Sequence, residues 1–361
     1  SFVESSETFI AKKSSVNDEI DALRHRATRA LLERKDVVVV ASVSCIYGLG
    51  LPAEYLEAST SLQVGDTVEL QELIGQLESM LYSRPEEDML RGNYQLSSIL
   101  SNGTDDETTT HVLSLWPPHE RHPMRIEIES LSSNGLSRVK SILGQGGATD
   151  SIHVFPAKHH VMAEEQLEAA RFSIEQELKE RVEELMTEGK VVEAQRLQQR
   201  VLTDLLMLKE TGFCSGGENY SRHFAGRQAG EPPDTLMDYL GLSGNGDWLL
   251  VVDESHVTLP QLKAMFGGDQ ARKRTLVKHG YRLPSALDNR PLQHTEFWAQ
   301  VKQAVFVSAT PGTQELEWTK RDPVEMIIRP TFVCDPVIHV RPPQSQLDDL
   351  LKEVKSRTEK K

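Results

Sequence analysis

Two adjacent acidic residues, Asp253 and Glu254, are the sharpest chemical feature of the sequence, and His256 follows them closely. They come directly after the apolar run 248–252, which is typical of a buried parallel strand. In an open α/β sheet, ligands bind at the carboxyl ends of the strands. Hydrolysis of a nucleoside triphosphate needs one acid to hold the hydrated Mg²⁺ and another to orient or deprotonate the attacking water. The pair could supply both roles, although such a pair also arises by chance after an apolar strand.

A second strand-end motif, Ser308-Ala309-Thr310, follows the apolar run 304–307. Small hydroxyl residues in this position can link a nucleotide site to the movement of a neighbouring domain, whereas a plain strand-to-loop turn uses the same residue types. Together, the two strand ends resemble motifs II and III of superfamily 2 helicases. The pair favours a nucleotide-hydrolysing site more strongly than either motif does alone.

A phosphate-binding loop of the form G-x-x-x-x-G-K-[ST] is absent from the 361 residues. The Gly189-Lys190 pair is followed by Val191, and no lysine follows the glycines within 144–147. The backbone N–H groups and the lysine of such a loop supply the main electrostatic support of the β- and γ-phosphates. The sequence therefore predicts that this part of a nucleotide site lies outside the chain.

Two elements are expected near the beginning of the chain. Residues 14–34 form a predicted helix, with Ser15 in an N-cap arrangement. The run 37–41, Val-Val-Val-Val-Ala, is expected to be a strand buried on both faces. The apolar positions of the helix recur at helical spacing and comprise Ile20, Leu23, Ala27, Ala30 and Leu31.

The middle of the chain predicts two insertions. Short strand-like runs at 111–116 and 124–128 alternate with polar stretches, which indicates an inserted α+β domain between about 57 and 152. The Glu-, Gln- and Leu-rich stretch 162–209 predicts two antiparallel helices that turn near Gly189. The expected fold class is therefore α/β, a parallel sheet with an inserted α+β domain and a helical insertion.

The bulk composition narrows the function classes. With 361 residues and 38% hydrophobic composition, the chain is expected to form two or three globular domains. A net charge of −14 repels a phosphate backbone at long range, so any DNA contact must be local. Cys45, Cys214 and Cys334 lie far apart, which argues against a disulfide framework or a cysteine zinc site and favours a cytoplasmic protein. No apolar run is long enough for a membrane span.

Longer stretches of the sequence resemble the UvrB family from end to end. This resemblance implies an ATP- and Mg²⁺-dependent component of nucleotide excision repair that verifies DNA damage with UvrA and loads the incision nuclease UvrC. It also implies part of a RecA-like superfamily 2 helicase domain. The start at Ser1 and the polar ends favour an internal fragment. The segments that carry the resemblance are 1–10, 36–50, 212–222, 252–261 and 280–291.

The resemblance also assigns roles at the two strand ends. It implies that Asp253 holds Mg²⁺ through water, that Glu254 activates water, and that His256 couples the nucleotide state to neighbouring contacts. Ser308-Ala309-Thr310 would be the coupling motif III. The alternative for His256 is a locally hydrogen-bonded structural histidine.

For DNA, the resemblance points to residues 1–17 as part of a β-hairpin that slides between the two strands. Phe2 and Phe9 would stack on bases, an interaction worth about 1–3 kcal/mol per base, and Lys12 and Lys13 would contact phosphates. Alternatively, the rings pack on the protein surface and the lysines are solvated.

For the partner UvrA, the resemblance implies docking on the inserted domain 57–152. Arg138 and Lys140 fall on basic positions that would meet an acidic partner surface. The polar stretch 101–110 departs from the family pattern. Simple exposed charges are the alternative for Arg138 and Lys140.

The resemblance also implies how the chain divides into domains and which helicase motifs it lacks. Residues 336–361 resemble the beginning of a second helicase domain, and the arginines of motif VI are missing, so the chain alone is expected to have negligible ATPase activity. The alternative functions are a non-catalytic scaffold that bridges UvrA and DNA, and a fragment of a transcription-repair coupling factor.

The chain is expected to divide into six parts. They are 1–17 (partial hairpin), 18–56 (part of the first helicase domain), 57–152 (UvrA-docking insertion), 153–247 (helical insertion), 248–335 (first helicase domain with motifs II and III) and 336–361 (start of the second helicase domain).

Overall fold

The computed structural model describes residues 2–3, 8–9, 17–100, 109–131, 135–159, 162, 164–243, 247–326, 334 and 336–359. The chain divides into two compact units, Ser1–Gly312 and Thr313–Lys361. The second unit contains helices α10 (Thr313–Trp318) and α11 (Gln346–Thr358). The first begins with two short strands, β1 (Phe2–Val3) and β2 (Thr8–Phe9). Among the described residues, no helix is both long and apolar enough to cross a bilayer.

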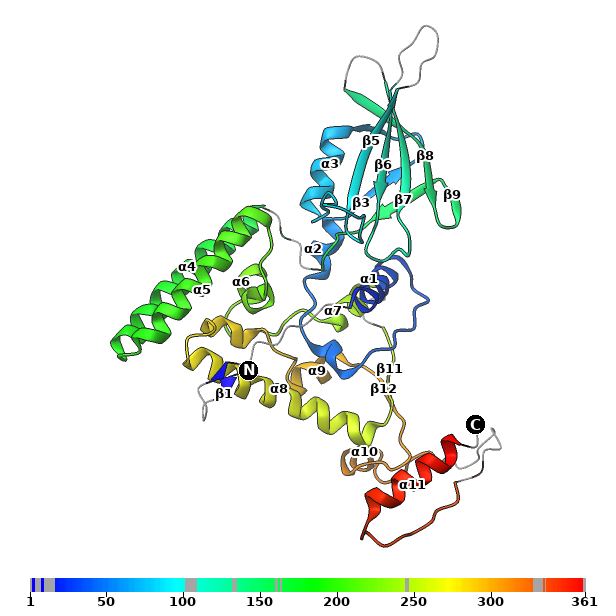
Figure 1. Cartoon of the computed structure of the whole chain (residues 1–361), viewed down its shortest axis with the longest axis vertical. Coiled ribbons are helices and arrows are strands. Elements are labelled where there is room, and N and C mark those ends of the chain that lie inside the picture. Colours follow the sequence, from blue (N-terminus) through cyan, green and yellow to red (C-terminus); the bar gives the residue numbers. More distant parts are fainter. Residues whose placement is uncertain are drawn as a thin grey trace. The chain divides into compact units, whose positions relative to one another are not determined.

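An antiparallel sheet with one helix makes up the insertion that follows residue 57 (Figure 1). The strands lie in the order β4-β8-β7-β6-β5, and β9 pairs with β8. The strands expected at 111–116 and 124–128 are confirmed as β6 and β7. The bounds are β4 Thr67–Glu69, β5 Tyr94–Leu100, β6 Thr109–Leu115, β7 Met124–Ser130, β8 Leu136–Gly144 and β9 Gly147–Thr149.

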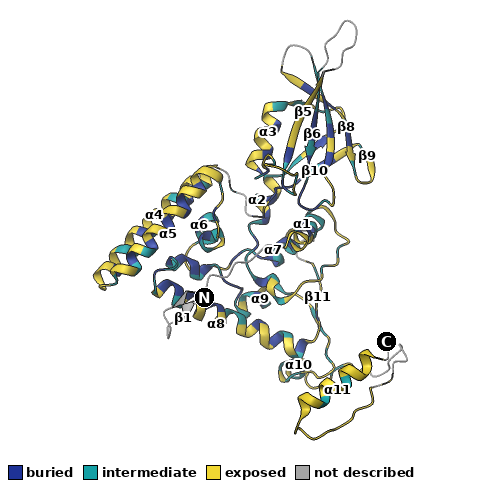
Figure 2. Cartoon of the chain, in the orientation of Figure 1, coloured by how far each residue is buried: buried dark blue, intermediate teal, exposed yellow. Residues whose placement is uncertain are grey.

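The core of this insertion lies between the sheet and helix α3 (Leu70–Ser79). In β7, Ile126 and Ile128 are buried, whereas the residues on either side of each are less buried. Figure 2 shows buried and exposed positions side by side along the strands of this sheet. Leu73 and Leu77 of α3 belong to the same apolar cluster. Because successive strand residues point to opposite faces, the alternation directs one apolar face onto the helix. Each fully buried side chain of this size contributes about 1.5–3 kcal/mol.

Strands β3 (Thr60–Gln63) and β10 (Ser151–Val154) form the base of the insertion. They pair antiparallel, with Leu62 opposite Ile152. The chain therefore enters and leaves the sheet at neighbouring points, close to the expected limits. The division of the chain into six parts remains a prediction.

Helices α4 (Glu164–Thr187) and α5 (Val191–Thr211) form the expected hairpin (Figure 1). Gly189 lies in the turn with a φ of 75°, and Gly212 ends α5 with a φ of 68°. Glycine adopts this left-handed backbone conformation without the steric strain of a Cβ. The buried apolar residues shared by the two helices include Ile174, Leu178, Leu185, Ala194, Leu197 and Val201.

Glu177 fastens the hairpin to two segments that are distant in the sequence. Its carboxylate accepts hydrogen bonds from His223 Nε2 at 2.6 Å and from the backbone N–H of Ser285 at 2.7 Å. His223 belongs to the short helix α6 (Ser221–Phe224), which follows η3 (Gly217–Tyr220), and Ser285 belongs to η4 (Pro284–Asp288).

Arg222 adds two ion pairs to the same junction. Its guanidinium lies 3.4 Å from a carboxylate oxygen of Glu177 and 3.0 Å from one of Asp288. Segments 212–222 and 280–291 therefore meet on α4. Because these groups are largely buried, removing one partner would leave an uncompensated charge.

The acidic motif lies in the remaining part of the first unit, beside two parallel strands. β11 (Leu250–Val252) pairs with β12 (Ala304–Phe306), which confirms the expected parallel arrangement of these runs. Val251 and Val305 are 57% and 47% exposed, so the expectation of burial on both faces is wrong for this pair of strands. The neighbouring elements are η2 (Val43–Ile46), α2 (Pro52–Glu57), α7 (Leu236–Ser243), α8 (Ser255–Lys278) and α9 (His294–Gln300).

Helix α1 (Asp18–Glu33) is confirmed, and its buried face agrees with the expected one only in part, because Leu31 packs inward whereas Ile20 and Leu23 do not. Asn17 is its N-cap, and the Asn17 side chain accepts hydrogen bonds from two backbone N–H groups of the first turn at 3.0 and 3.2 Å. The expected cap, Ser15, lies outside the described residues. Ile20 and Leu23 are 57% and 58% exposed. The face that packs inward carries Ala22, His25, Thr28 and Leu31.

The expected strand at 37–41 is wrong. The run is irregular, and Val38 and Val40 are 91% and 95% exposed. No strand in the described residues pairs with it, and a strand requires a neighbour for its backbone N–H and C=O groups. Val37 and Val39 instead pack against an apolar cluster that includes Leu31.

Candidate functional site

The two predicted motifs lie at the same edge of the parallel strand pair. Val252 is opposite Phe306, so the residues that follow them leave the strands side by side. The backbone N–H of Val307 donates to Val252 O at 2.9 Å, and the N–H of Ser255 donates to Val307 O at 3.0 Å. These bonds fix the position of the acidic turn relative to the second strand.

Asp253 and Glu254 form a sharp turn between β11 and α8. Glu254 has a φ of 45°, a left-handed conformation that costs a non-glycine residue about 1–2 kcal/mol. Its N–H donates to Asp253 Oδ1 at 2.9 Å, and the Thr258 hydroxyl donates to Asp253 O at 2.9 Å. Both acids are exposed at the strand end. This position is accessible to a hydrated cation, and adjacent carboxylate oxygens suit Mg²⁺.

His256 and Ser308 join the two motifs directly. His256 Nδ1 lies 2.8 Å from Ser308 Oγ and 3.4 Å from Glu254 Oε2. The N–H of Thr310 donates to Ser308 Oγ at 3.0 Å. The hydroxyl of Ser308, which accepts this bond, can in addition either donate to or accept from the imidazole, according to the tautomer of His256. The structure thus connects Glu254, through His256 and Ser308, to Thr310, with Ala309 in the same exposed turn.

The predicted DNA-contacting residues lie at the beginning of the chain. β1 and β2 pair antiparallel, with Phe2 opposite Phe9. Most of the segment 1–17 lies outside the described residues, so the DNA-binding hairpin and base stacking by its rings both stay predictions. Lys12 and Lys13 lie outside the described residues.

The two predicted partner-binding residues lie on β8. Arg138 and Lys140 are exposed, on the face of the strand opposite Val139, which is buried. Lys140 Nζ is 3.6 Å from a carboxylate oxygen of Glu129 on β7. An exposed pair of this kind contributes at most about 1 kcal/mol, so both cations remain available to a partner.

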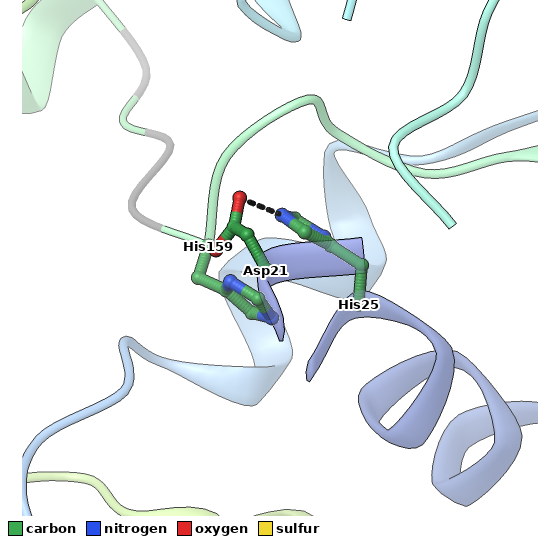
Figure 3. Close-up of side chains that lie close together, drawn as sticks. All are labelled: Asp21, His25 and His159. Carbon is green, nitrogen blue, oxygen red and sulfur yellow. Dashed lines mark ion pairs between the residues drawn. The ribbon is translucent and has the colours of Figure 1, made fainter. Parts of the chain in front are cut away.

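A cluster of three polar side chains was missed in the sequence. Asp21 and His25 of α1 lie beside His159, which follows β10 (Figure 3). Asp21 and His25 are one helical turn apart in the sequence, and this spacing could have predicted that their side chains lie on the same face of the helix. The apolar periodicity of the same helix instead predicted that Ile20 and Leu23 would be buried.

Comparison with known proteins identifies related sequences over the whole chain. Residues 165–226 match the family model described as the UvrB third helical domain, which corresponds to α4, α5 and α6. The chain is 49% identical over 361 residues to UvrABC system protein B of Gloeothece citriformis, covering all of this chain and 52% of that protein. It is 49% identical over 357 residues to the protein of the same name from a Nostoc species, covering 99% and 51%.

The chain spans about half the length of these curated relatives. Within that span the similarity includes the sheet insertion, the helical hairpin and the two strand ends alike, because the aligned region reaches across the whole chain. With this match and the helical domain at 165–226, the chain is similar to UvrB proteins over its whole length.

Proposed function

We propose that the chain acts in a UvrABC system of nucleotide excision repair, where it verifies DNA damage in an ATP-dependent manner. The observation that carries this proposal is the hydrogen bond between His256 and Ser308, which joins the two strand-end motifs at 2.8 Å. The names of the relatives, UvrABC system protein B, support the same assignment.

In this proposal the strand ends are one side of an ATP site of a RecA-like helicase domain. Asp253 holds the hydrated Mg²⁺, and Glu254 orients and deprotonates the attacking water. Mg²⁺ supplies charge neutralisation at the phosphates. His256 lies between Glu254 and Ser308, so a change at the acid is passed to the second strand end through one imidazole ring.

The proposal also assigns contacts with DNA and UvrA to two parts of the first unit. The β1–β2 pair contacts DNA through Phe2 and Phe9, and the exposed Arg138 and Lys140 of the sheet insertion dock on UvrA. UvrC is then loaded for incision in the cytoplasm. A net charge of −14 supports local rather than general DNA binding.

A single substitution in a full-length protein that contains this chain tests the proposal. Glu254→Ala should abolish ATP-dependent loading on damaged DNA, measured by gel shift with and without ATP. The matched control is Glu180→Ala, which removes an exposed acid from the outer face of α4. Unchanged loading in Glu254→Ala would instead favour a non-catalytic scaffold that bridges UvrA and DNA.

The 361-residue chain alone should not hydrolyse ATP, because it has no G-x-x-x-x-G-K-[ST] loop. Phosphate release at saturating Mg²⁺-ATP is the measurement. Turnover by the purified chain that disappears in Glu254→Ala would contradict this expectation and place a complete site within these residues.

A further inference from the structure

A groove with mostly basic walls lies within the first unit, between α1 and the sheet insertion. Its volume is about 530 Å³, and it is formed mainly by the second half of α1 and by the loop 116–123 between β6 and β7. Figure 1 shows this end of the sheet beside α1. Four arginines outnumber two glutamates in its walls, in a chain with a net charge of −14. The charged residues of this arginine groove are Arg26, Arg29, Glu33, Arg34, Glu120 and Arg121.

Hydrogen bonds fix the loop wall of the arginine groove and join it to α1. The carbonyl oxygen of Glu120 accepts from Trp116 Nε1 and from Arg91 Nε, each at 3.2 Å. Arg26 Nε donates to the carbonyl oxygen of His119 at 2.6 Å, which connects the helix to the loop. The backbone of the groove is therefore ordered without a ligand. A ligand that binds there avoids most of the free-energy cost of ordering a loop.

Arg29 holds both acids of the arginine groove. Its Nε donates to Glu33 Oε2 at 2.8 Å, and its Nη1 donates to Glu120 Oε1 at 3.1 Å. The two carboxylates thus converge on one guanidinium group. Neither of them forms an ion pair with Arg26 or Arg121. The acids therefore leave part of the positive charge in the groove without a counter-charge.

Arg26 and Arg121 carry that remaining charge, because no carboxylate within the described part of the chain pairs with either. Arg26 uses only its Nε for the loop, so its two Nη groups can bind a ligand, and Arg121 is exposed. Arg34 forms an exposed ion pair with Asp36, at 2.9 Å. Such a pair adds little to stability, so a phosphate group can replace the carboxylate of Asp36. Guanidinium groups bind phosphate oxygens through two parallel N–H donors.

The positive potential inside the arginine groove acts on His119. This residue lines the groove but is only 2% exposed, and neither ring nitrogen has a hydrogen-bond partner among the described residues. Burial lowers the pKa of His119 most, and the charges of Arg29 and Arg26 contribute to a value of about 3. The imidazole is therefore neutral at physiological pH. The excess positive charge comes from the arginines alone, and an anion in the groove would reduce it.

The arginines are spaced for a row of phosphates rather than for one small anion. Arg26 lies in the middle of α1 and Arg34 is its C-cap residue, so the backbone between them rises about 12 Å along the helix axis. Phosphates on one strand of duplex DNA advance about 3.4 Å along the axis, so this length matches roughly three or four of them. No Phe, Tyr or Trp of the described residues lines the groove, which leaves a base no ring to stack on.

We propose that the arginine groove binds the phosphate backbone of duplex DNA through Arg26, Arg34 and Arg121, without reading the base sequence. The inference rests on the proposed function for the source of the phosphates, and it adds a second DNA contact to that of the β1–β2 pair. Phosphate contacts fix the position of a protein on DNA but carry no sequence information. The groove therefore holds the duplex while other residues test it for damage.

The test measures the binding of a fluorescein-labelled duplex to the 361-residue chain, without nucleotide, by fluorescence anisotropy at several salt concentrations. Arg121→Gln and Arg26→Gln should each weaken binding about tenfold at about 50 mM salt. Each should also reduce the slope of log affinity against log salt concentration by about 0.9, the value for one phosphate contact. Lys179→Gln, which removes an exposed cation from α4, is the control and should change neither quantity.

Two further variants keep the result separate from folding and from the proposed function. Arg121 is exposed and has no ion-pair partner, so thermal melts of Arg121→Gln should match those of the wild type. Phe2→Ala combined with Phe9→Ala should weaken binding without changing the salt slope, because ring stacking releases no counter-ions. Wild-type affinity in this double variant, together with losses in the arginine variants, would contradict the role of the β1–β2 pair and support the groove.

Three results would overturn the proposal. The first is a wild-type chain that does not bind the duplex, or arginine variants with an unchanged salt slope. The second is a loss of affinity for a labelled polyglutamate peptide but not for DNA in Arg121→Gln, which would assign the groove to an acidic protein. The third is full displacement of the duplex by inorganic phosphate at an equal concentration of phosphate groups, which would indicate a site for free phosphate.

Discussion

The Nδ1 atom of His256 and the Oγ atom of Ser308 lie 2.8 Å apart, although 52 positions separate the two residues in the sequence. Each residue follows a different parallel strand, and the strands are held in register by the pairing of Val252 with Phe306. The bond therefore couples the acidic turn to the small-residue turn through side chains, in addition to the backbone bonds between the strands.

We expect this bond to be measurable as an interaction free energy. In a double-mutant cycle of His256→Ala and Ser308→Ala, the two losses of unfolding free energy should be non-additive by about 0.5–1.5 kcal/mol. Urea unfolding of the four proteins is the measurement. Ser308→Thr, which keeps the hydroxyl, is the control. Additive losses would mean that the contact does not stabilise the fold.

Gly280 should tolerate no side chain. Its φ is +68°, and a Cβ added there would overlap the backbone of Glu193 on α5. Gly280→Ala should lower the free energy of unfolding by roughly 2–5 kcal/mol, from backbone strain and overpacking together. Gly189→Ala is the matched control, because Gly189 has a φ of +75° and open space around it, so only strain of about 1 kcal/mol applies. Equal losses in chemical denaturation would show that α5 moves aside.

The junction at Glu177 should weaken in acid. Burial by itself raises the pKa of Glu177, but hydrogen bonds from His223 and Ser285 and the charge of Arg222 outweigh it and hold this pKa below the ordinary value of 4.5. A carboxyl whose folded-state pKa is depressed stabilises the fold above its unfolded value. That stabilisation is lost as the pH falls below 4.5 through the folded-state pKa.

Glu177→Gln should therefore reduce stability at pH 7, by roughly 1–3 kcal/mol, and should have less effect well below pH 4.5. Thermal melts of both proteins across this range are the measurement. Glu180→Gln, at an exposed position of the same helix, should behave as the wild type at every pH. A Glu177→Gln effect that is independent of pH would contradict the assigned role of the carboxylate charge.

Charge reversal on β8 should separate folding from partner binding. Arg138→Glu combined with Lys140→Glu should change the free energy of unfolding by about 0.5 kcal/mol or less, because both side chains are exposed. In the proposed function, the same change should weaken binding to UvrA at least tenfold. Lys179→Glu, an exposed lysine on α4, is the control. The affinity for UvrA is measured by surface plasmon resonance. An unchanged affinity of the double variant would exclude β8 as the docking strand.

The features that depend on local periodicity could be predicted from the sequence. The α4–α5 hairpin turns at Gly189, and Ile126 and Ile128 alternate with less buried neighbours in β7, because helical and strand periods are properties of nearby residues. The strand-end positions of Asp253 and Ser308 were predictable for the same reason, since each follows its own apolar run.

The contacts between distant elements could not be predicted from the sequence. The run at 37–41 has the composition of a strand, but strand formation requires a hydrogen-bonding neighbour, and none of the described strands pairs with it. Helix α1 turns His25 inward, instead of Leu23, because Tyr55 and His159 are there to contact it. Contacts between residues so far apart in the chain depend on the packing of whole elements, which no local pattern specifies.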